Sequence, residues 1–367
     1  MKVAIFKIGA RIHQNEKIGN STNEILSCIE MLLEAGVDVT GITKVLDSDN
    51  KDTTFPIKDF KWFFENINSF DKVIVVNGSY NFFGGAENEC DIMTYKAINK
   101  FDKEIVYMLY DPYLTPKQMA KNVESKEWGS KYNIDELVIP ENRLHYITQC
   151  RDTSSFKPEC KKTIQYYPLE LFPMFTEHGY FTEVDFDKAE FDLNYAGTWR
   201  GGRREKSMIK YFFGLPDDIR VQMFGNLKLE QFKKHGDLRP PQFGAPVTHD
   251  KVRENILKGL STVIIGDPLY AKLDDIAQRA AESIIFGQIT FIDSDYDRKN
   301  RFYKDKELKD FLRIDNREQL VDRLRLIKKD KTMFYNLLKA QRDDLFKDFD
   351  PHQYCVGLAK MIEMIHD

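Results

Sequence analysis

A glycine-rich turn with three arginines is the strongest chemical signal in the sequence. Tyr195–Arg204 reads YAGTWRGGRR and places Arg200, Arg203 and Arg204 between an apolar segment and a helical pattern that begins at Glu205. Backbone N–H groups at a helix start attract anions, and arginines at this spacing can bind phosphate oxygens. The structural alternative is a solvated basic helix start with an arginine paired to Glu205. The turn has neither the Walker nor the GxGxxG pattern, which disfavours ATP hydrolysis and nicotinamide chemistry.

A second candidate pair, Arg279 and Glu282, lies in a helical pattern predicted from Ile276 to Phe286. Residues three apart share one face of a helix. The arginine could therefore meet a diphosphate while the carboxylate accepts hydrogen bonds from ribose hydroxyls. An ordinary surface ion pair is the structural alternative, and the spacing alone favours it.

Two further carboxylates are candidates for proton transfer or substrate contact. Asp111 follows the predicted strand Glu104–Leu109 and precedes Pro112. The carboxyl end of a strand suits a general base, although Asp-Pro also opens turns. Glu24 comes three residues after Ser21, which is the spacing of a capping box, so helix capping is the favoured interpretation there.

The remaining polar motifs are less informative. The loop Asn77–Gly85, NGSYNFFGG, suits either tight turning or polar ligand contact. His13, His235 and His249 lack metal-binding spacing and are predicted to be surface residues. The five cysteines are widely spaced without a CxxC pair, which disfavours disulfide frameworks and zinc sites and favours a reducing cytoplasm.

Apolar strands and amphipathic helices alternate in two series, so the fold class predicted is α/β, with doubly wound parallel sheets. A Pro-rich, aromatic and acidic stretch, Pro168–Asp187, separates the two series. In such folds ligands bind beyond the carboxyl ends of the strands. The predicted strands are Val3–Ile8, Val37–Ile42, Lys72–Val76, Glu104–Leu109, Leu144–Thr148 and Thr163–Tyr167, then Leu193–Gly197, Val221–Phe224, Thr262–Gly266 and Gln288–Ile292. The predicted helices start at Glu24 and span Asp91–Phe101, Glu205–Phe213, Lys251–Gly259 and Ile276–Phe286, and the pattern is helical from Arg317 to the end.

Length and composition agree with this organisation. The 367 residues, 42% of them hydrophobic, are enough for about two domains, and they exclude collagen-like and disordered classes. Apolar runs are strand-sized and the N-terminus lacks a signal-peptide pattern, so neither a membrane span nor a signal peptide is expected. The net charge of −4 excludes a wholly basic nucleic-acid coat, yet residues 200–260 carry 13 Lys and Arg against 7 Asp and Glu. That local excess could receive a polyanion.

Taken together, these residues resemble the DNA β-glucosyltransferase family of T-even bacteriophages. The resemblance runs in collinear order across nearly the whole chain. It rests on KVAI from Lys2, VIVVNGSYNFFGG from Val73, YAGTWR from Tyr195 and VIIGD from Val263. It implies a GT-B fold, in which two Rossmann-like domains face a central cleft. Residues 1–170, joined by a C-terminal helix in 345–367, would form the acceptor domain, and residues 171–344 would bind a UDP-sugar.

The resemblance also implies an activity and a set of site residues. Family members transfer a sugar, with inversion, from a UDP-sugar to 5-hydroxymethylcytosine in double-stranded DNA, with the base flipped out of the helix. Asp111 would be the general base, with Glu24 close to the sugar. Positions matching the donor site are Thr198, Arg200, Arg204, Gly225, Val247, Asp267, Tyr270, Arg279 and Glu282. Those matching the acceptor-side loop are Asn77, Asn81, Phe82 and Gly84.

Three departures from the family pattern bear on the donor. The loop Arg11–Asn20 is longer than expected, Arg279 and Glu282 align only after a one-residue insertion following Asp267, and the overall charge is acidic. The first two changes lie beside the sugar and donor pockets, so glucose and arabinose both remain open. Mg²⁺ or Mn²⁺ is compatible with the site, but no acidic pair requires it.

The resemblance sets expectations for the whole protein. We expect a monomer without membrane association that acts in the cytoplasm of an infected bacterial host. Two alternatives differ in class: a GT-B UDP-sugar transferase with a non-DNA acceptor, and a non-catalytic nucleotide-sugar or DNA-binding module. The family-specific loops disfavour the first. Asp111 together with three matching arginines disfavours the second, because binding alone needs no base.

Overall fold

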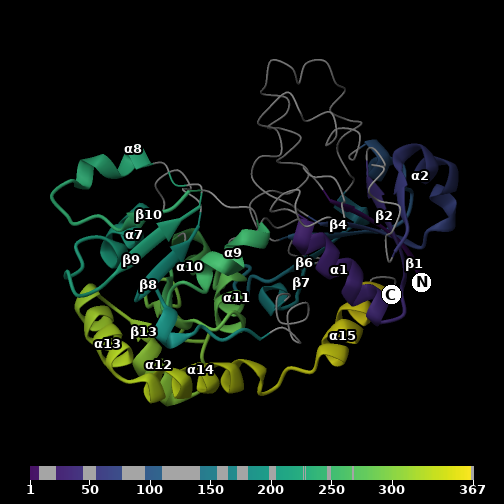
Figure 1. Ribbon diagram of the computed structural model, residues 1–367. Helices are drawn as coiled ribbons and strands as arrows, with labels where there is room; N and C mark the ends of the chain where they lie inside the picture. Colours follow the sequence, from purple (N-terminus) through teal and green to yellow (C-terminus); the bar gives the residue numbers. More distant parts are fainter. Residues whose placement is uncertain are drawn as a thin grey trace. The chain divides into compact units, whose positions relative to one another are not determined.

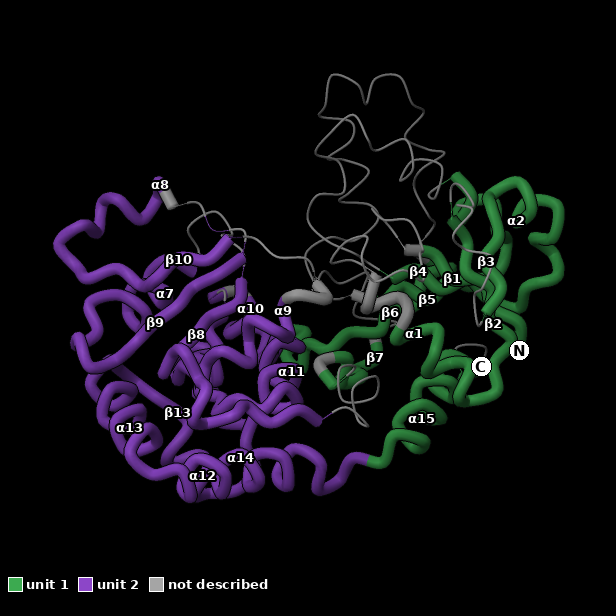
Figure 2. Tube along the Cα trace, viewed as in Figure 1, with its two compact units in different colours: residues 1–172, 350–367 green, residues 173–349 purple. Residues whose placement is uncertain are grey.

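A computed structural model describes two compact units of the chain (Figure 2). The first comprises residues 1–172 and 350–367, and the second residues 173–349. The structure describes residues 1–7, 22–43, 55–76, 96–109, 141–154, 164–171, 181–197 and 204–364, apart from 226, 228, 246–248 and 267. Structural statements below concern these residues.

The first unit is built on a seven-stranded parallel sheet in the order β3-β2-β1-β4-β5-β6-β7 (Figure 1). The central strands are near-continuous apolar runs, and all five residues of β4 are buried. Such runs are typical of parallel strands covered on both faces. The strands are β1 (Lys2–Lys7), β2 (Asp38–Thr43), β3 (Ile57–Asp59), β4 (Lys72–Val76), β5 (Ile105–Leu109), β6 (Leu144–Thr148) and β7 (Ile164–Tyr166).

The helices of the first unit have clear start and stop signals. The helix α1 (Thr22–Glu34) ends at Gly36, whose φ of +78° is the left-handed conformation that favours glycine. Asp59 caps α2 (Phe60–Asn66), and Asp350 caps α15 (Pro351–Glu363), which packs against α1. Short 3₁₀ turns occupy Ile67–Ser69, Glu141–Arg143 and Leu169–Leu171, and residues 96–100 are helical.

The second unit contains two three-stranded parallel sheets, β10-β9-β8 and β11-β12-β13. They meet where β8 lies beside β11: Leu260 N donates to Phe191 O at 3.0 Å, and Ser261 Oγ donates to Asp192 O at 2.6 Å. The strands are β8 (Leu193–Ala196), β9 (Val221–Phe224), β10 (Gln242–Phe243), β11 (Ser261–Ile264), β12 (Ile289–Asp293) and β13 (Arg313–Ile314).

Helices surround these sheets and enclose one hydrophobic core (Figure 1). They are α7 (Glu205–Phe212), α8 (Leu229–Phe232), α9 (His249–Ile256), α10 (Pro268–Leu273), α11 (Arg279–Ile285), α12 (Lys306–Leu312), α13 (Arg317–Lys329) and α14 (Lys331–Phe346), with 3₁₀ turns at Phe186–Lys188 and Lys233–His235. None of the helices in the described ranges combines the length and apolar character of a membrane span.

The alternating pattern predicted from the sequence is confirmed, with differences at element ends. The strands Lys72–Val76, Leu144–Thr148 and Val221–Phe224 have the predicted bounds. The helix predicted from Ile276 begins at Arg279 instead, and Ala277 N, just before it, donates to the Tyr296 hydroxyl. The short strands β3, β10 and β13 were not predicted, since two or three residues carry no periodicity.

Candidate functional site

The structure describes only part of the predicted site. Arg204, Gly225, Tyr270, Arg279 and Glu282 lie in the second unit, within the described ranges. Glu24 lies in α1, where the backbone alone is described. The predicted residues outside the described ranges are Asn77, Asn81, Phe82, Gly84, Asp111, Thr198, Arg200, Val247 and Asp267.

Arg204 and Arg279 line one cavity of about 160 Å³ at the carboxyl ends of β8 and β11. The remaining walls come from the strand ends and from Ala277. Two segments 75 positions apart are therefore brought together where parallel α/β sheets bind ligands. We refer to this space as the donor cavity. Its lining residues are Tyr195, Ala196, Gly197, Arg204, Thr262, Val263, Ile264, Ile265, Ala277 and Arg279.

Arg204 occupies the position before the first turn of α7 and is mostly buried. Burial disfavours its positive charge, but the neighbouring phenol groups of Tyr195 and Tyr296 favour it, and the pKa of Arg204 is raised overall. Its Nε is buried and has no hydrogen-bond partner among the described residues. A buried guanidinium N–H without a partner is costly, so this atom is suited to an anionic ligand.

Arg279 and Glu282 form the ion pair that their spacing predicts. Arg279 Nη1 lies 3.2 Å from Glu282 Oε2, and the two side chains are 32% and 16% exposed. That nitrogen makes no well-aligned hydrogen bond among the described residues. The pair is therefore less exposed than a solvated surface pair, and the carboxylate holds the guanidinium at the donor cavity.

Gly225 lets the ends of two strands approach closely beside this cavity. Its φ is +118°, and a Cβ there would lie 2.0 Å from Gly197 O. No side chain can be accommodated at that position without moving the backbone of the glycine-rich turn. The residue matching the family's donor site thus has a structural role in joining β8 to β9.

Glu205 has partners that the sequence did not indicate. It accepts hydrogen bonds from Lys234 Nζ at 2.5 Å and His235 Nε2 at 2.8 Å, and it makes no ion pair with Arg204, the arginine of the turn that the structure describes. His235 is therefore a partner of that carboxylate, with a side chain that is 28% exposed. Glu205 and His235 are 30 positions apart, so no local sequence pattern indicates this contact.

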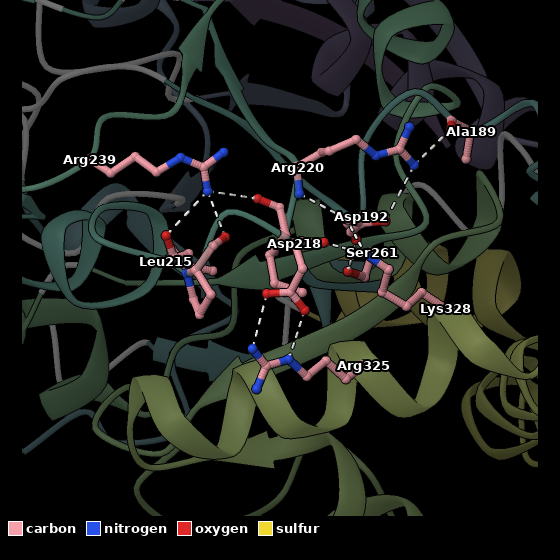
Figure 3. A network of polar contacts seen from close by, with 11 residues as sticks. Ala189, Asp192, Leu215, Asp218, Arg220, Arg239, Ser261, Arg325 and Lys328 are labelled. Carbon is pink, nitrogen blue, oxygen red and sulfur yellow. Dashed lines mark hydrogen bonds and ion pairs between the residues drawn. The ribbon is translucent and has the colours of Figure 1, made fainter.

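Part of the basic excess in residues 200–260 is engaged inside the second unit (Figure 3). At the amino ends of β8 and β9, buried Asp192 accepts a hydrogen bond from Arg220 N at 2.8 Å. Its carboxylate also lies 3.4 Å from Arg220 Nη2 and 3.2 Å from Lys328 Nζ. Arg239 donates to the carbonyl oxygens of Leu215, Pro216 and Ile219. These arginines stabilise the unit and contribute less to a polyanion surface than their count suggests.

Known proteins resemble the chain over most of its length. Residues 1–177 match the model of the family described as "Bacteriophage T4 beta-glucosyltransferase". The "DNA beta-glucosyltransferase" of Enterobacteria phage T4 is 27% identical over 352 residues, which cover 95% of each chain. A solved structure of T4 phage BGT in complex with UDP and Mn²⁺ has a TM-score of 0.82 and 26% identity, covering 99% of this chain and 100% of the other.

A more distant structure has the same architecture. An alpha-glucosyltransferase in complex with UDP-glucose and DNA containing an abasic site has a TM-score of 0.63 and 13% identity, covering 100% of this chain and 99% of the other. At that identity the likeness concerns the fold alone. The predicted GT-B fold is confirmed by these structural similarities.

Proposed function

Because the chain belongs to the bacteriophage T4 β-glucosyltransferase family, we propose that it transfers a sugar from a UDP-sugar to DNA. The observation that carries this proposal is the convergence of Arg204 and Arg279 on the donor cavity. The unpartnered Nε of Arg204 supports an anionic occupant. The diphosphate of a UDP-sugar has the charge and the multiple acceptor oxygens that two guanidinium groups recognise.

Different residues contact the diphosphate, the ribose, the uracil and the sugar of the donor. Arg204, Arg279 and Arg200 hold the diphosphate and neutralise the charge that develops as UDP departs. Glu282 accepts hydrogen bonds from the ribose, and the backbone near Val247 meets the uracil. Thr198, Asp267 and Tyr270 complete the donor contacts, while Glu24 contacts the sugar.

The acceptor in this proposal is the hydroxymethyl group of a flipped 5-hydroxymethylcytosine in double-stranded DNA. Asp111 removes the hydroxyl proton, and the oxygen attacks the anomeric carbon from the face opposite UDP. The new carbon–oxygen bond forms as the bond to the diphosphate breaks. UDP therefore leaves with the electron pair, and the configuration at the anomeric carbon inverts. The loop that includes Asn77, Asn81, Phe82 and Gly84 lies on the acceptor side.

A divalent ion is not assigned to residues of this chain. The T4 structure contains UDP and Mn²⁺. Among the described residues of this chain, no three His, Cys, Asp or Glu side chains are grouped to hold a metal.

The sugar and the setting complete the proposal. Glucose and arabinose are the two candidates, with the choice assigned to the region Arg11–Glu24. We further propose that the enzyme is a monomer and acts in the cytoplasm of the infected bacterial host. The acidic overall charge gives it no general affinity for DNA, so binding relies on local contacts.

An intact-mass assay tests the proposed function. Short duplexes containing cytosine or 5-hydroxymethylcytosine are each incubated with UDP-glucose or UDP-arabinose. A hexose or a pentose increment confined to the hydroxymethylated strand would support transfer and identify the sugar. No increment with either donor would contradict DNA as the acceptor.

The Asp111→Asn variant tests the base. Removing a general base lowers turnover by roughly a hundredfold or more. Calorimetric titration should show unchanged affinity for UDP, because Asp111 is assigned no donor contact. Unchanged turnover in this variant would refute the assignment of the base even if the reaction itself is correct.

A further inference from the structure

We propose that Tyr296 is a positioning residue of the donor cavity: it fixes the segment that leads into Arg279. No sequence pattern indicates this role, because Tyr296 lies in a polar turn after β12. The inference rests on the proposed function, since it assumes that the arginines bind a diphosphate. Tyr296 itself is not assigned a contact with the ligand.

The hydroxyl of Tyr296 makes a direct contact with the cavity wall. It accepts a hydrogen bond from Ala277 N at 2.7 Å, and Ala277 lines the donor cavity two residues before Arg279. This N–H precedes α11 and so has no partner within the helix. The tyrosine thereby fixes the path of the chain just before the arginine.

The ring of Tyr296 packs against the end of β11. A Cβ added to Gly266 would lie 2.0 and 2.1 Å from two ring carbons, so glycine is required for the ring to occupy this place. Gly266 directly precedes Asp267, another residue that matches the family's donor site. One side chain therefore contacts two chain segments that carry predicted donor residues.

Tyr296 is a buried and uncharged side chain. It is 4% exposed. Burial raises the pKa of Tyr296 well above its ordinary value. The hydroxyl is consequently neutral at physiological pH and keeps its hydrogen-bonding role there.

The turn that carries Tyr296 is held by several hydrogen bonds. Tyr296 N donates to Asp293 O at 2.9 Å. The buried carboxylate of Asp297 accepts from Arg301 N at 2.9 Å and from Phe302 N at 3.3 Å. A side chain anchored in this way can hold the residues that it touches, which is what preorganisation of a binding site requires.

Tyr303 provides a matched control in the same unit. It is 2% exposed, and its hydroxyl donates to Thr290 O at 2.6 Å and contacts Gln341 Oε1 at 2.9 Å. Neither partner lines the donor cavity. A purely structural role for Tyr296 would make the two tyrosines equivalent.

The experiment compares Tyr296→Phe with Tyr303→Phe in the full chain. Thermal unfolding and calorimetric titration with UDP are measured for both variants. We expect both to lose stability and Tyr296→Phe alone to raise the Kd for UDP, by roughly three- to tenfold, as one lost hydrogen bond implies. The KM for the UDP-sugar should rise in parallel. If UDP binds Tyr296→Phe as tightly as the wild type, the proposal is wrong.

Gly266→Ala disturbs the packing of the Tyr296 ring from the glycine side. It serves as a second variant if Tyr296→Phe fails to fold. The added methyl group displaces the ring, so the Kd for UDP should rise again. Gly357→Ala is its control, since a Cβ there meets the nearest atoms at 3.8 Å. Equal UDP affinity in the two alanine variants would overturn the proposal.

The wild-type titration separates this inference from the proposed function. A wild-type chain that does not bind UDP would overturn both. A wild-type chain that binds UDP, with affinity unchanged in Tyr296→Phe and Gly266→Ala, would overturn the role of Tyr296 alone.

Discussion

Charged groups around the donor cavity are each held by a particular neighbour. Tyr195 lines the cavity together with Arg204, and Glu282 Oε2 lies 3.2 Å from Arg279 Nη1. Beside them, Glu205 is fixed by Lys234 and His235 at the start of α7. Groups that are already in place need not be ordered when the ligand binds, which is how fixed dipoles and charges become effective.

The contacts of Glu205 predict a pH dependence of stability. Burial opposes its ionisation, but the hydrogen bonds from Lys234 and His235 outweigh burial and lower the pKa of the carboxyl. A carboxyl whose pKa is lowered in the folded state stabilises the protein at pH values above its ordinary pKa, near 4.3. That stability is lost as the pH falls through the lower, folded-state pKa. Between pH 6 and pH 3 the wild type should therefore lose about 1 kcal/mol more unfolding free energy than Glu205→Gln.

Urea unfolding at the two pH values measures this difference. Glu230→Gln is the control, because Glu230 is 74% exposed and pairs only with Lys233 among the contacts described. The interpretation fails if Glu205→Gln and the wild type lose equal stability on acidification.

At the scale of elements, the C-terminal helix is fastened by a buried lysine. Lys72 is fully buried in β4, and its Nζ donates to the carbonyl oxygens of Ile362 and Glu363 in the last turn of α15. The last carbonyls of a helix lack partners within the helix and carry partial negative charge. The ammonium group satisfies them and so ties residues that are 290 positions apart.

Lys72→Met should release this end of α15. Loss of hydrogen bonds from a charged donor predicts a decrease of about 2 kcal/mol in unfolding free energy. Amide hydrogen exchange in residues 351–363 should accelerate, with smaller changes in β1 and β2. Lys61→Met changes an exposed lysine and serves as the control. Unaltered exchange in α15 would show that its other contacts, with α1 and through Tyr354 with Pro168, hold the helix without Lys72.

At the scale of the whole molecule, the first unit is built on one sheet and the second on two, and the donor cavity lies within the second unit. Ligands that bind only the native state stabilise it by mass action. At a UDP concentration one hundred times its Kd, the free energy of unfolding of the second unit should increase by about 2.7 kcal/mol.

Amide hydrogen exchange measured with and without UDP shows which elements the ligand stabilises. Protection should increase in β8, β11 and α11, and it should disappear in an Arg279→Ala variant at the same UDP concentration. Protection confined to the strands of the first unit would place the UDP site elsewhere.

The elements could largely be predicted from the sequence. Val73–Val76 is an uninterrupted β-branched run that suits a strand buried on both faces, and Gly36 ends α1 because it adopts a positive φ. These are local effects, which the chain expresses within a few residues. The arginine turn and the Arg279–Glu282 spacing were visible for the same reason, because a motif of adjacent residues needs no knowledge of the fold.

Contacts between distant residues could not be predicted. The pairing of Glu205 with His235, the capping of α15 by Lys72 and the contact of Tyr296 with Gly266 join segments whose separation in sequence carries no signal. The sequence by itself determined where most of the longer strands and helices form and which residue types are suited to bind phosphate. Only the tertiary structure decided which side chains hold those motifs in place, because that choice depends on how the strands are ordered and the helices packed.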